Sequence, residues 1–326
     1  MPAPSSVPRV ATGLLAAGAI ALAGCGGSDD EGTASLRAPD AASFPAADGR
    51  TLEQVLSEAD SEGPVVSPAG QVFHKGENRY AFGVFTVDRE QIADAEVALY
   101  VAHGPKGEAK GPFPARVESL EVEPQFESKT TADDPDSART VYVADLPLEA
   151  NGEWRVGALV RDGESLQASL APSAVVGQFS DIPQAGDKAP RVHTPTAEEV
   201  GGDLSKIDTR VPPDTMHEDD LVDVLGREPV VLVFATPALC KSRVCGPTVD
   251  IAEQVKSEYG DQAAFIHMEI YNDNAVEKGL RPQVNAYNLP TEPWVFVIDE
   301  NGRITESIEG AASPGALERA IQEVTG

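Results

Sequence analysis

The sequence predicts an α/β domain at the C-terminal end of the chain, preceded by an all-β antiparallel domain. Between about residues 65 and 180, short β-rich runs follow one another with turn signals and no helical pattern between them. After residue 229, fully apolar runs alternate with helical stretches, which is typical of a sheet covered on both faces. The 326 residues are enough for about two domains.

Residues 1–24 have the pattern of an export signal. Arg9 precedes an apolar run from Val10 to Ala23, which is shorter than the roughly 20 apolar residues that a spanning helix needs. The segment Leu22-Ala23-Gly24-Cys25 resembles the lipobox of bacterial lipoproteins. That resemblance implies cleavage before Cys25, lipidation of Cys25, and an extracytoplasmic protein that is lipid-anchored at the cell membrane.

Residues 25–50 are small, polar and rich in Pro and Gly, so we expect a flexible tether there. The next domain spans residues 51–180 and begins with a short amphipathic helix at 51–59, because Thr51 and Gln54 have the spacing of a capping box. Five β-rich runs follow: YAFGVFTV, AEVALYVA, ARTVYVADL, EWRVGALV and SLQASLAPSAVV. They predict an antiparallel, immunoglobulin-like sandwich.

Two tight turns support this β domain. Asn151-Gly152 is one, and Asp162-Gly163 is the other, with strand-like runs close on both sides as in a hairpin. The domain has no cysteine, and its histidines, His74 and His103, lie far apart in the sequence. We therefore expect it to serve as a spacer or a partner-binding module rather than to hold a catalytic site.

The last domain spans residues 181–326. An irregular, Pro-rich segment leads into an expected helix near residues 218–225. Strands are predicted at PVVLVFAT, AAFIHMEIY and PWVFVIDE, with a turn at NGRI leading into one more strand, and helices at PTVDIAEQVKSEYG and SPGALERAIQEVT.

The chain is strongly acidic, with a formal charge of −28. Removal of residues 1–24, whose one charged side chain is Arg9, makes this −29. Such a surface repels phosphate backbones, so a nucleic-acid partner is not expected. It also disfavours polybasic docking to anionic lipid, which leaves the lipid anchor as the only expected contact with the membrane.

With Cys25 lipidated, the remaining cysteines are Cys240 and Cys245. Cys245-Gly246-Pro247 precedes a helix, and proline is favoured in a first helical turn, so Cys245 is expected at the helix N-terminus, where the macrodipole favours a thiolate. Two α-helical residues five apart are roughly 8–9 Å apart at Cα, too far for a disulfide, so Cys240 must lie in the preceding loop. Lys241 and Arg243 are electrostatic candidates that would also favour a thiolate.

These features together resemble the thioredoxin family over about residues 185–326: an apolar strand, a loop with cysteines, Cys-Gly-Pro at a helix start, and a proline before a later strand. The segment Gly186-Asp187-Lys188-Ala189-Pro190 is similar to the opening of the TlpA-like and peroxiredoxin branches. Trp294 to Asp299, with Asn301-Gly302, is similar to the strand and hairpin after the family's cis-proline. Counting back from Asp299 puts that proline at Pro293 rather than at Pro290.

The resemblance implies a thiol-disulfide oxidoreductase with Cys240 and Cys245 as catalytic residues. It also implies that Glu292 and Pro293 offer a backbone edge to substrate, that protein thiols or disulfides are the partners, and that no cofactor or metal is needed. This chain departs from the family because it has CxxxxC where thioredoxins have CxxC. Either cysteine can then be the nucleophile, and the Gly-Pro that directly follows it favours Cys245.

Three alternatives remain at this point. A Sco-type copper-binding protein would use both cysteines and a distant residue such as His267 or Met268, with His193 and His217 as further candidates. A peroxidase would use Ser242, three residues before Cys245, as the hydroxyl residue of the peroxiredoxin motif, although Pro237 is one position out of register. A non-catalytic binding lipoprotein would keep Cys240–Cys245 as a permanent structural disulfide.

Overall fold

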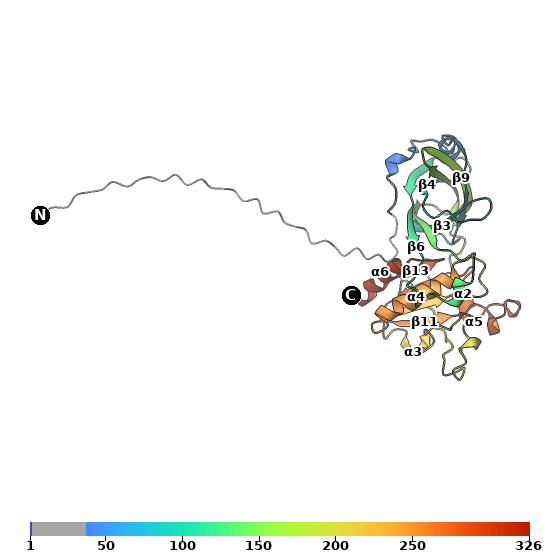
Figure 1. Cartoon of the computed structure of the whole chain (residues 1–326), viewed down its shortest axis with the longest axis vertical. Helices are drawn as coiled ribbons and strands as arrows, with labels where there is room; N and C mark the ends of the chain where they lie inside the picture. Colours follow the sequence, from blue (N-terminus) through green and yellow to red (C-terminus); the bar gives the residue numbers. More distant parts are fainter. Residues whose placement is uncertain (2–36) are drawn as a thin grey trace. The chain divides into compact units, whose positions relative to one another are not determined.

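The computed structural model describes Met1 and residues 37–326. Cys25, the export signal and residues 26–36 lie outside the described residues. The described residues 37–326 belong to one compact unit, which Figure 1 colours along the sequence. None of the helices in the described part is long and apolar enough to cross a membrane.

The first half of the described chain is built from antiparallel strands. Before and between them lie three short helices: η1 (Ala41–Ser43), α1 (Leu52–Leu56) and α2 (Lys129–Ala132). The strands are β1 (Ser61–Glu62), β2 (Val65–Pro68), β3 (Gly76–Phe85), β4 (Glu96–His103), β5 (Ala109–Pro114), β6 (Arg116–Ser119), β7 (Thr140–Leu148), β8 (Gly152–Asp162) and β9 (Ser165–Val176).

These strands form two sheets, in the orders β1-β9-β8-β4-β5 and β2-β3-β7-β6. Every pair is antiparallel except β1 with β9. One apolar cluster holds residues of both sheets, including Phe82, Leu99 and Tyr142. Several antiparallel sheets are therefore present as predicted, while the immunoglobulin-like arrangement stays a prediction.

The capping box and one of the tight turns predicted for this half are present. Thr51 and Gln54 form the capping box at the start of α1, with each side chain bonded to the other residue's backbone. The β8–β9 hairpin turns between Asp162 and Ser165, where Gly163 has a φ of 61° that glycine adopts readily.

The predicted tether of residues 25–50 is wrong at its C-terminal end. Phe44 and Ala47 are buried in a cluster with Leu52 and Tyr100. The Tyr100 hydroxyl also donates a hydrogen bond of 2.6 Å to the Pro45 carbonyl. Phe44, Ala47 and the Pro45 carbonyl together attach this segment beside α1 and β4.

The second half is an α/β unit. Its strands are β10 (Val230–Phe234), β11 (Ala264–Met268), β12 (Trp294–Ile298) and β13 (Ile304–Glu309). Its helices are η2 (Leu204–Lys206), α3 (Leu221–Val224), α4 (Cys245–Tyr259), η3 (Asn272–Asn274), η4 (Val276–Lys278), α5 (Pro282–Ala286) and α6 (Pro314–Thr325). The strands form one sheet in the order β11-β10-β12-β13, and β10 runs parallel to β11 and antiparallel to β12.

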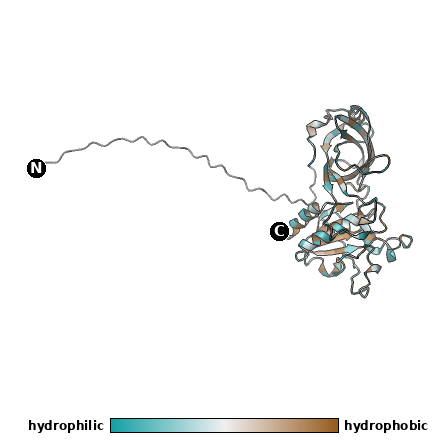
Figure 2. Cartoon of the chain, in the orientation of Figure 1, coloured by the Kyte–Doolittle hydropathy of each residue, from teal (hydrophilic) through white to brown (hydrophobic). Residues whose placement is uncertain are grey.

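Both faces of this sheet are covered, as its apolar strands predict. Residues of α4 and α6 pack on one face with Val231 and Val233, and residues of α3 and α5 pack on the other with Leu232 and Phe296. Figure 2 shows the hydrophobic colouring along these strands. This half is therefore a mixed α/β unit as predicted, while the thioredoxin-like arrangement stays a prediction.

Candidate functional site

The two cysteines form a disulfide at the end of β10. Cys240 lies in the loop after the strand and Cys245 is the first residue of α4. Their Cα atoms are 6.0 Å apart, within the range that a disulfide requires. Cys240 and Cys245 therefore occupy the loop and helix-start positions that the spacing predicts.

The two sulfur-bearing residues differ in exposure. Cys245 has no exposed surface and belongs to an apolar cluster with Val249 of α4 and Val143 of β7. Cys240 is partly buried and packs at the edge of that cluster. A partner molecule can thus reach Cys240 first, which is the reverse of the order that the Gly-Pro signal favours.

Pro293 follows the cis peptide bond after Glu292, as the sequence predicts, and Pro290 does not follow one. Ser242 connects this bond to the disulfide. Its hydroxyl donates a hydrogen bond of 3.2 Å to the Glu292 carbonyl and lies 3.1 Å from the sulfur of Cys240. Both cysteines and the cis-proline segment therefore form one site, with Ser242 between them.

The hydroxyl of Ser242 should stabilise a thiolate at Cys240, because it can donate its proton to a charged sulfur instead of the carbonyl. We expect Ser242→Ala to move the midpoint of the pH-dependent alkylation of Cys240 upward by up to about one pH unit, the value of one hydrogen bond. Iodoacetamide labelling of the reduced protein followed by mass spectrometry measures this midpoint. Ser257→Ala, on the exposed side of α4, is the control, and equal midpoints in both variants would contradict the assignment.

The charged residues near the disulfide have different surroundings. Glu292 is half-buried, and burial raises its pKa against the opposing effect of Lys241. The guanidinium of Arg243 pairs with Asp136 at 3.2 Å and lies over the ring of Phe85. Of the two electrostatic candidates, Lys241 thus acts on Glu292, whereas Arg243 contacts residues of the β-rich half of the chain.

The histidines predicted as possible copper ligands do not form a cluster of possible metal ligands with Cys240 or Cys245 in the described part of the chain. His193 is exposed and bonded to Asp220 at 2.6 Å, a contact that raises the pKa of this imidazole. His267 places its two ring nitrogens 2.7 Å from Asp214 and 3.2 Å from the Ala235 carbonyl. Among the described residues, the one group of three or more possible metal ligands contains neither Cys240 nor Cys245.

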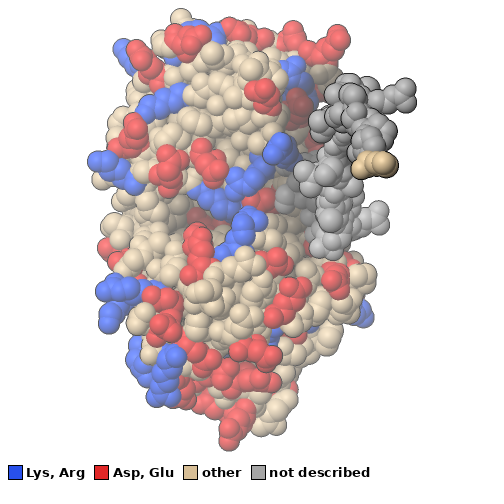
Figure 3. Space-filling model, turned by 90° about the vertical axis from the view of Figure 1, so that its left-hand side faces the viewer, with Lys and Arg blue, Asp and Glu red and all other residues tan. Residues whose placement is uncertain are grey.

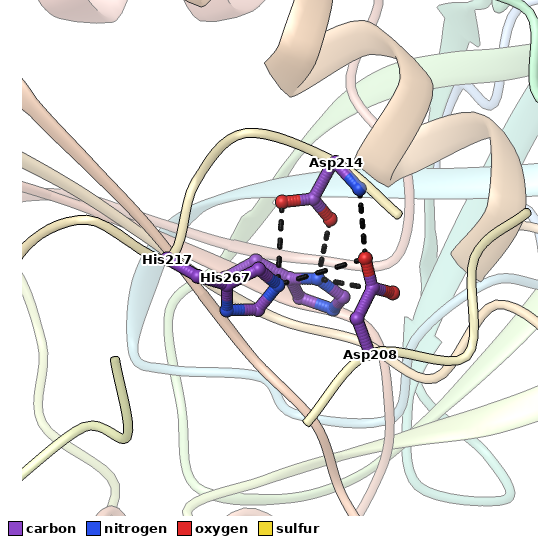
Figure 4. Close-up of side chains that lie close together, drawn as sticks. All are labelled: Asp208, Asp214, His217 and His267. Atoms are coloured by element: carbon purple, nitrogen blue, oxygen red, sulfur yellow. Dashed lines mark hydrogen bonds and ion pairs between the residues drawn. The ribbon is translucent and has the colours of Figure 1, made fainter. Parts of the chain in front are cut away.

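The sequence did not reveal a second cluster of polar side chains, which Figure 4 shows: Asp208, Asp214, His217 and His267. All four are buried. Burial alone would lower the pKa of His267, but the carboxylates of Asp214 and Asp208 raise it to about 10. In turn, burial opposes ionisation of Asp214, yet the neighbouring imidazoles hold the pKa of Asp214 well below its usual range.

Comparisons with known proteins find a likeness to solved structures. No protein-family model and no curated protein matches the chain. Among solved structures, the chain is similar to a thiol:disulfide interchange protein of the thioredoxin family from Chlorobium tepidum TLS, with 16% sequence identity and a TM-score of 0.30. That match covers 45% of this chain and 99% of the other chain.

Proposed function

We propose that the chain is a thiol-disulfide oxidoreductase in which Cys240 exchanges with the partner and Cys245 resolves the mixed disulfide. The observation that carries the proposal is the Cys240–Cys245 disulfide itself, which joins a partly exposed sulfur to a buried one at a helix N-terminus. The cis peptide bond before Pro293, reached through Ser242, supplies the neighbouring backbone edge.

The reaction starts from the reduced pair when it reduces a partner. The Cys240 thiolate attacks one sulfur of the partner's disulfide, that S–S bond breaks, and the other partner sulfur leaves as a thiolate. Cys245 then loses its proton and attacks the sulfur of Cys240, which releases the second partner thiolate. Two electrons pass to the partner, and the chain ends with its own disulfide. The same steps in reverse oxidise a partner dithiol.

Protein substrates fit the surroundings of Cys240. A groove of about 450 Å³ borders the disulfide loop, and its lining includes Ser242, Val244, Phe85 and the exposed Val65 and Val87. An extended segment of a client protein can place apolar side chains here while its sulfur meets Cys240. Figure 3 shows acidic and basic side chains scattered over the face in view, and the formal charge of −28 favours protein rather than nucleic-acid partners.

The proposal places the chain outside the cytoplasm, held at the membrane by lipid on Cys25. The support is the sequence alone, because Cys25 is outside the described residues. An oxidising compartment suits a dithiol that must cycle. Mass measurement of the mature protein tests the anchor: a chain that begins at Cys25 with attached diacylglycerol supports it, and an unmodified N-terminus rejects it.

The reduction potential tests the redox function. The protein is equilibrated with glutathione or dithiothreitol buffers, quenched, and its free thiols are counted by alkylation. We expect a potential between about −120 and −270 mV, the range of exchanging dithiols. A potential below about −300 mV would identify Cys240–Cys245 as a permanent structural disulfide and reject the proposal.

A further inference from the structure

The buried cluster of Asp208, Asp214, His217 and His267 joins a loop to a strand. The two carboxylates and His217 come from the irregular segment before α3, and His267 comes from β11. The backbone N–H of His267 donates to the Met216 carbonyl at 2.9 Å, so the loop runs along the edge of the sheet. One nitrogen or oxygen atom of each side chain lies within 4.8 Å of all the others.

The distances within this cluster suit four ligands around one small cation. Nδ1 of His267 is 2.7 Å from Oδ2 of Asp214 and 3.8 Å from Oδ1 of Asp208. Nε2 of His217 is 3.4 Å from Oδ1 of Asp214 and 3.6 Å from Oδ2 of Asp208, so each imidazole faces a different oxygen of each aspartate. Bonds of 2.0–2.1 Å around a tetrahedral Zn²⁺ place its ligand atoms about 3.3 Å apart. The observed spacings lie on both sides of that value.

Backbone groups hold the ligand atoms in place. Asp208 accepts hydrogen bonds from the N–H groups of Arg210 and Asp214, at 2.7 and 2.8 Å. Asp214 accepts one from the N–H of Met216 at 2.8 Å. Nε2 of His267 can donate to the Ala235 carbonyl, which leaves Nδ1 to face the carboxylates, as in metal sites where a second contact fixes the ring.

His217 gives an independent indication of a ligand. Its side chain is 2% exposed, and its Nε2 has no hydrogen-bond partner among the described residues. That nitrogen faces Asp208 and Asp214 (Figure 4). A buried polar atom without a partner costs about 1–3 kcal/mol, and such atoms are rare in folded proteins. A cation between the imidazoles and the carboxylates would bond to this atom.

We propose that Asp208, Asp214, His217 and His267 bind a structural Zn²⁺ ion. Two imidazole nitrogens and two carboxylate oxygens are ligands that zinc prefers, whereas Ca²⁺ and Mg²⁺ take six or more oxygens and Cu(I) prefers sulfur. Two charges on the ion balance the two buried carboxylates. The ion takes the place of the proton that otherwise lies between His267 and Asp214.

The site is closed and lies beside the disulfide loop. All four ligands are buried, which is typical of a structural rather than a catalytic zinc site. His267 contacts the carbonyl of Ala235, and the hydroxyl of Thr209 accepts a hydrogen bond from the N–H of Ala238 at 3.1 Å. Zinc would thus fix the segment that leads from β10 to Cys240. This role does not depend on whether the disulfide exchanges.

Metal analysis of the purified full-length chain tests the proposal. We expect about one zinc per chain after extensive dialysis. His217→Ala should lose that zinc and unfold at a lower temperature than the wild type. His193→Ala, which changes an exposed histidine outside the cluster, should keep the zinc and the unfolding temperature of the wild type. A Cys240→Ser/Cys245→Ser variant should also keep its zinc, because the sulfurs are not ligands.

Cobalt substitution keeps the test decisive if His217→Ala does not fold. The wild-type chain is stripped with a chelator and titrated with Co²⁺. We expect the visible d–d absorption of tetrahedral cobalt at about one equivalent, without a thiolate-to-cobalt charge-transfer band. A stripped chain that binds neither Co²⁺ nor Zn²⁺ would overturn the proposal and leave the cluster as a proton-bridged ion pair. Equal zinc in folded His217→Ala and wild type would also overturn it.

Discussion

Reduced Cys245→Ser is expected to keep a stable mixed disulfide after reaction with 5,5′-dithiobis(2-nitrobenzoate), whereas Cys240→Ser is expected to react little. The reason is the difference in exposure, since Cys240 lies at the surface edge of the apolar cluster and Cys245 is fully buried in it. The wild type should release about two thionitrobenzoate ions per chain, because Cys245 resolves the first adduct. Cys245→Ser should release about one and retain the other as an adduct visible by mass.

Denaturation supplies the control for this comparison. In guanidinium chloride both variants should release about one thionitrobenzoate at similar rates, because unfolding exposes each sulfur equally. A folded Cys240→Ser that reacts as fast as Cys245→Ser would show that Cys245 is the nucleophile, as its position before Gly246-Pro247 favours. The roles of the two cysteines would then be exchanged.

The parts of the site that the sequence predicts are those set by local chemistry. Pro247 in the first turn of α4 marks the helix start, and the length limit on a disulfide puts Cys240 in the loop. The position of the cis bond at Pro293 follows from its distance to the end of β12. Each of these needs only residues close in sequence, together with the family resemblance.

The exposure of the two sulfurs could not be predicted in this way. Cys245 is buried because residues distant in sequence, among them Val143 of β7 and Ala312 before α6, complete the cluster around it. The helix start indicates where a thiolate is stabilised but not whether solvent reaches it. The burial of Cys245 is therefore the observation that leads us to propose Cys240 as the nucleophile, a choice that the sequence leaves open.

The buried Asp/His cluster was missed for a related reason. His267 lies inside an apolar strand, where a hydrogen-bonded histidine is the ordinary expectation. Its partner Asp214 comes 53 residues earlier in the sequence. The segment that holds Asp208, Asp214 and His217 has no helical or strand period. The only feature of the sequence that could have indicated this cluster is two aspartates and a histidine close together next to prolines. That feature suggests a metal site only once the fold places His267 of β11 beside it.

Arg210, in the same segment, forms a buried ion pair with Asp250 of α4. Its Nε donates to the Asp250 carboxylate at 2.8 Å, and its other nitrogens donate to the carbonyls of Pro212 and Phe126. The second oxygen of Asp250 accepts from the backbone and hydroxyl of Ser128. One guanidinium thus connects α4 to two loops, including one from the β-rich half of the chain.

Arg210→Ala is therefore expected to lower the free energy of unfolding by about 3–5 kcal/mol, since it leaves a buried carboxylate without its counter-charge. Asp250 is 1% exposed, so solvent cannot take over that role without opening the structure. Urea unfolding measures the loss, and fluorescence of Trp154 and Trp294 reports from β8 and β12 together. Lys278→Ala, which breaks an exposed ion pair with Asp273, should leave the unfolding curve unchanged. A loss below about 1 kcal/mol in Arg210→Ala would show that Ser128 alone keeps the Asp250 carboxylate stable in the interior.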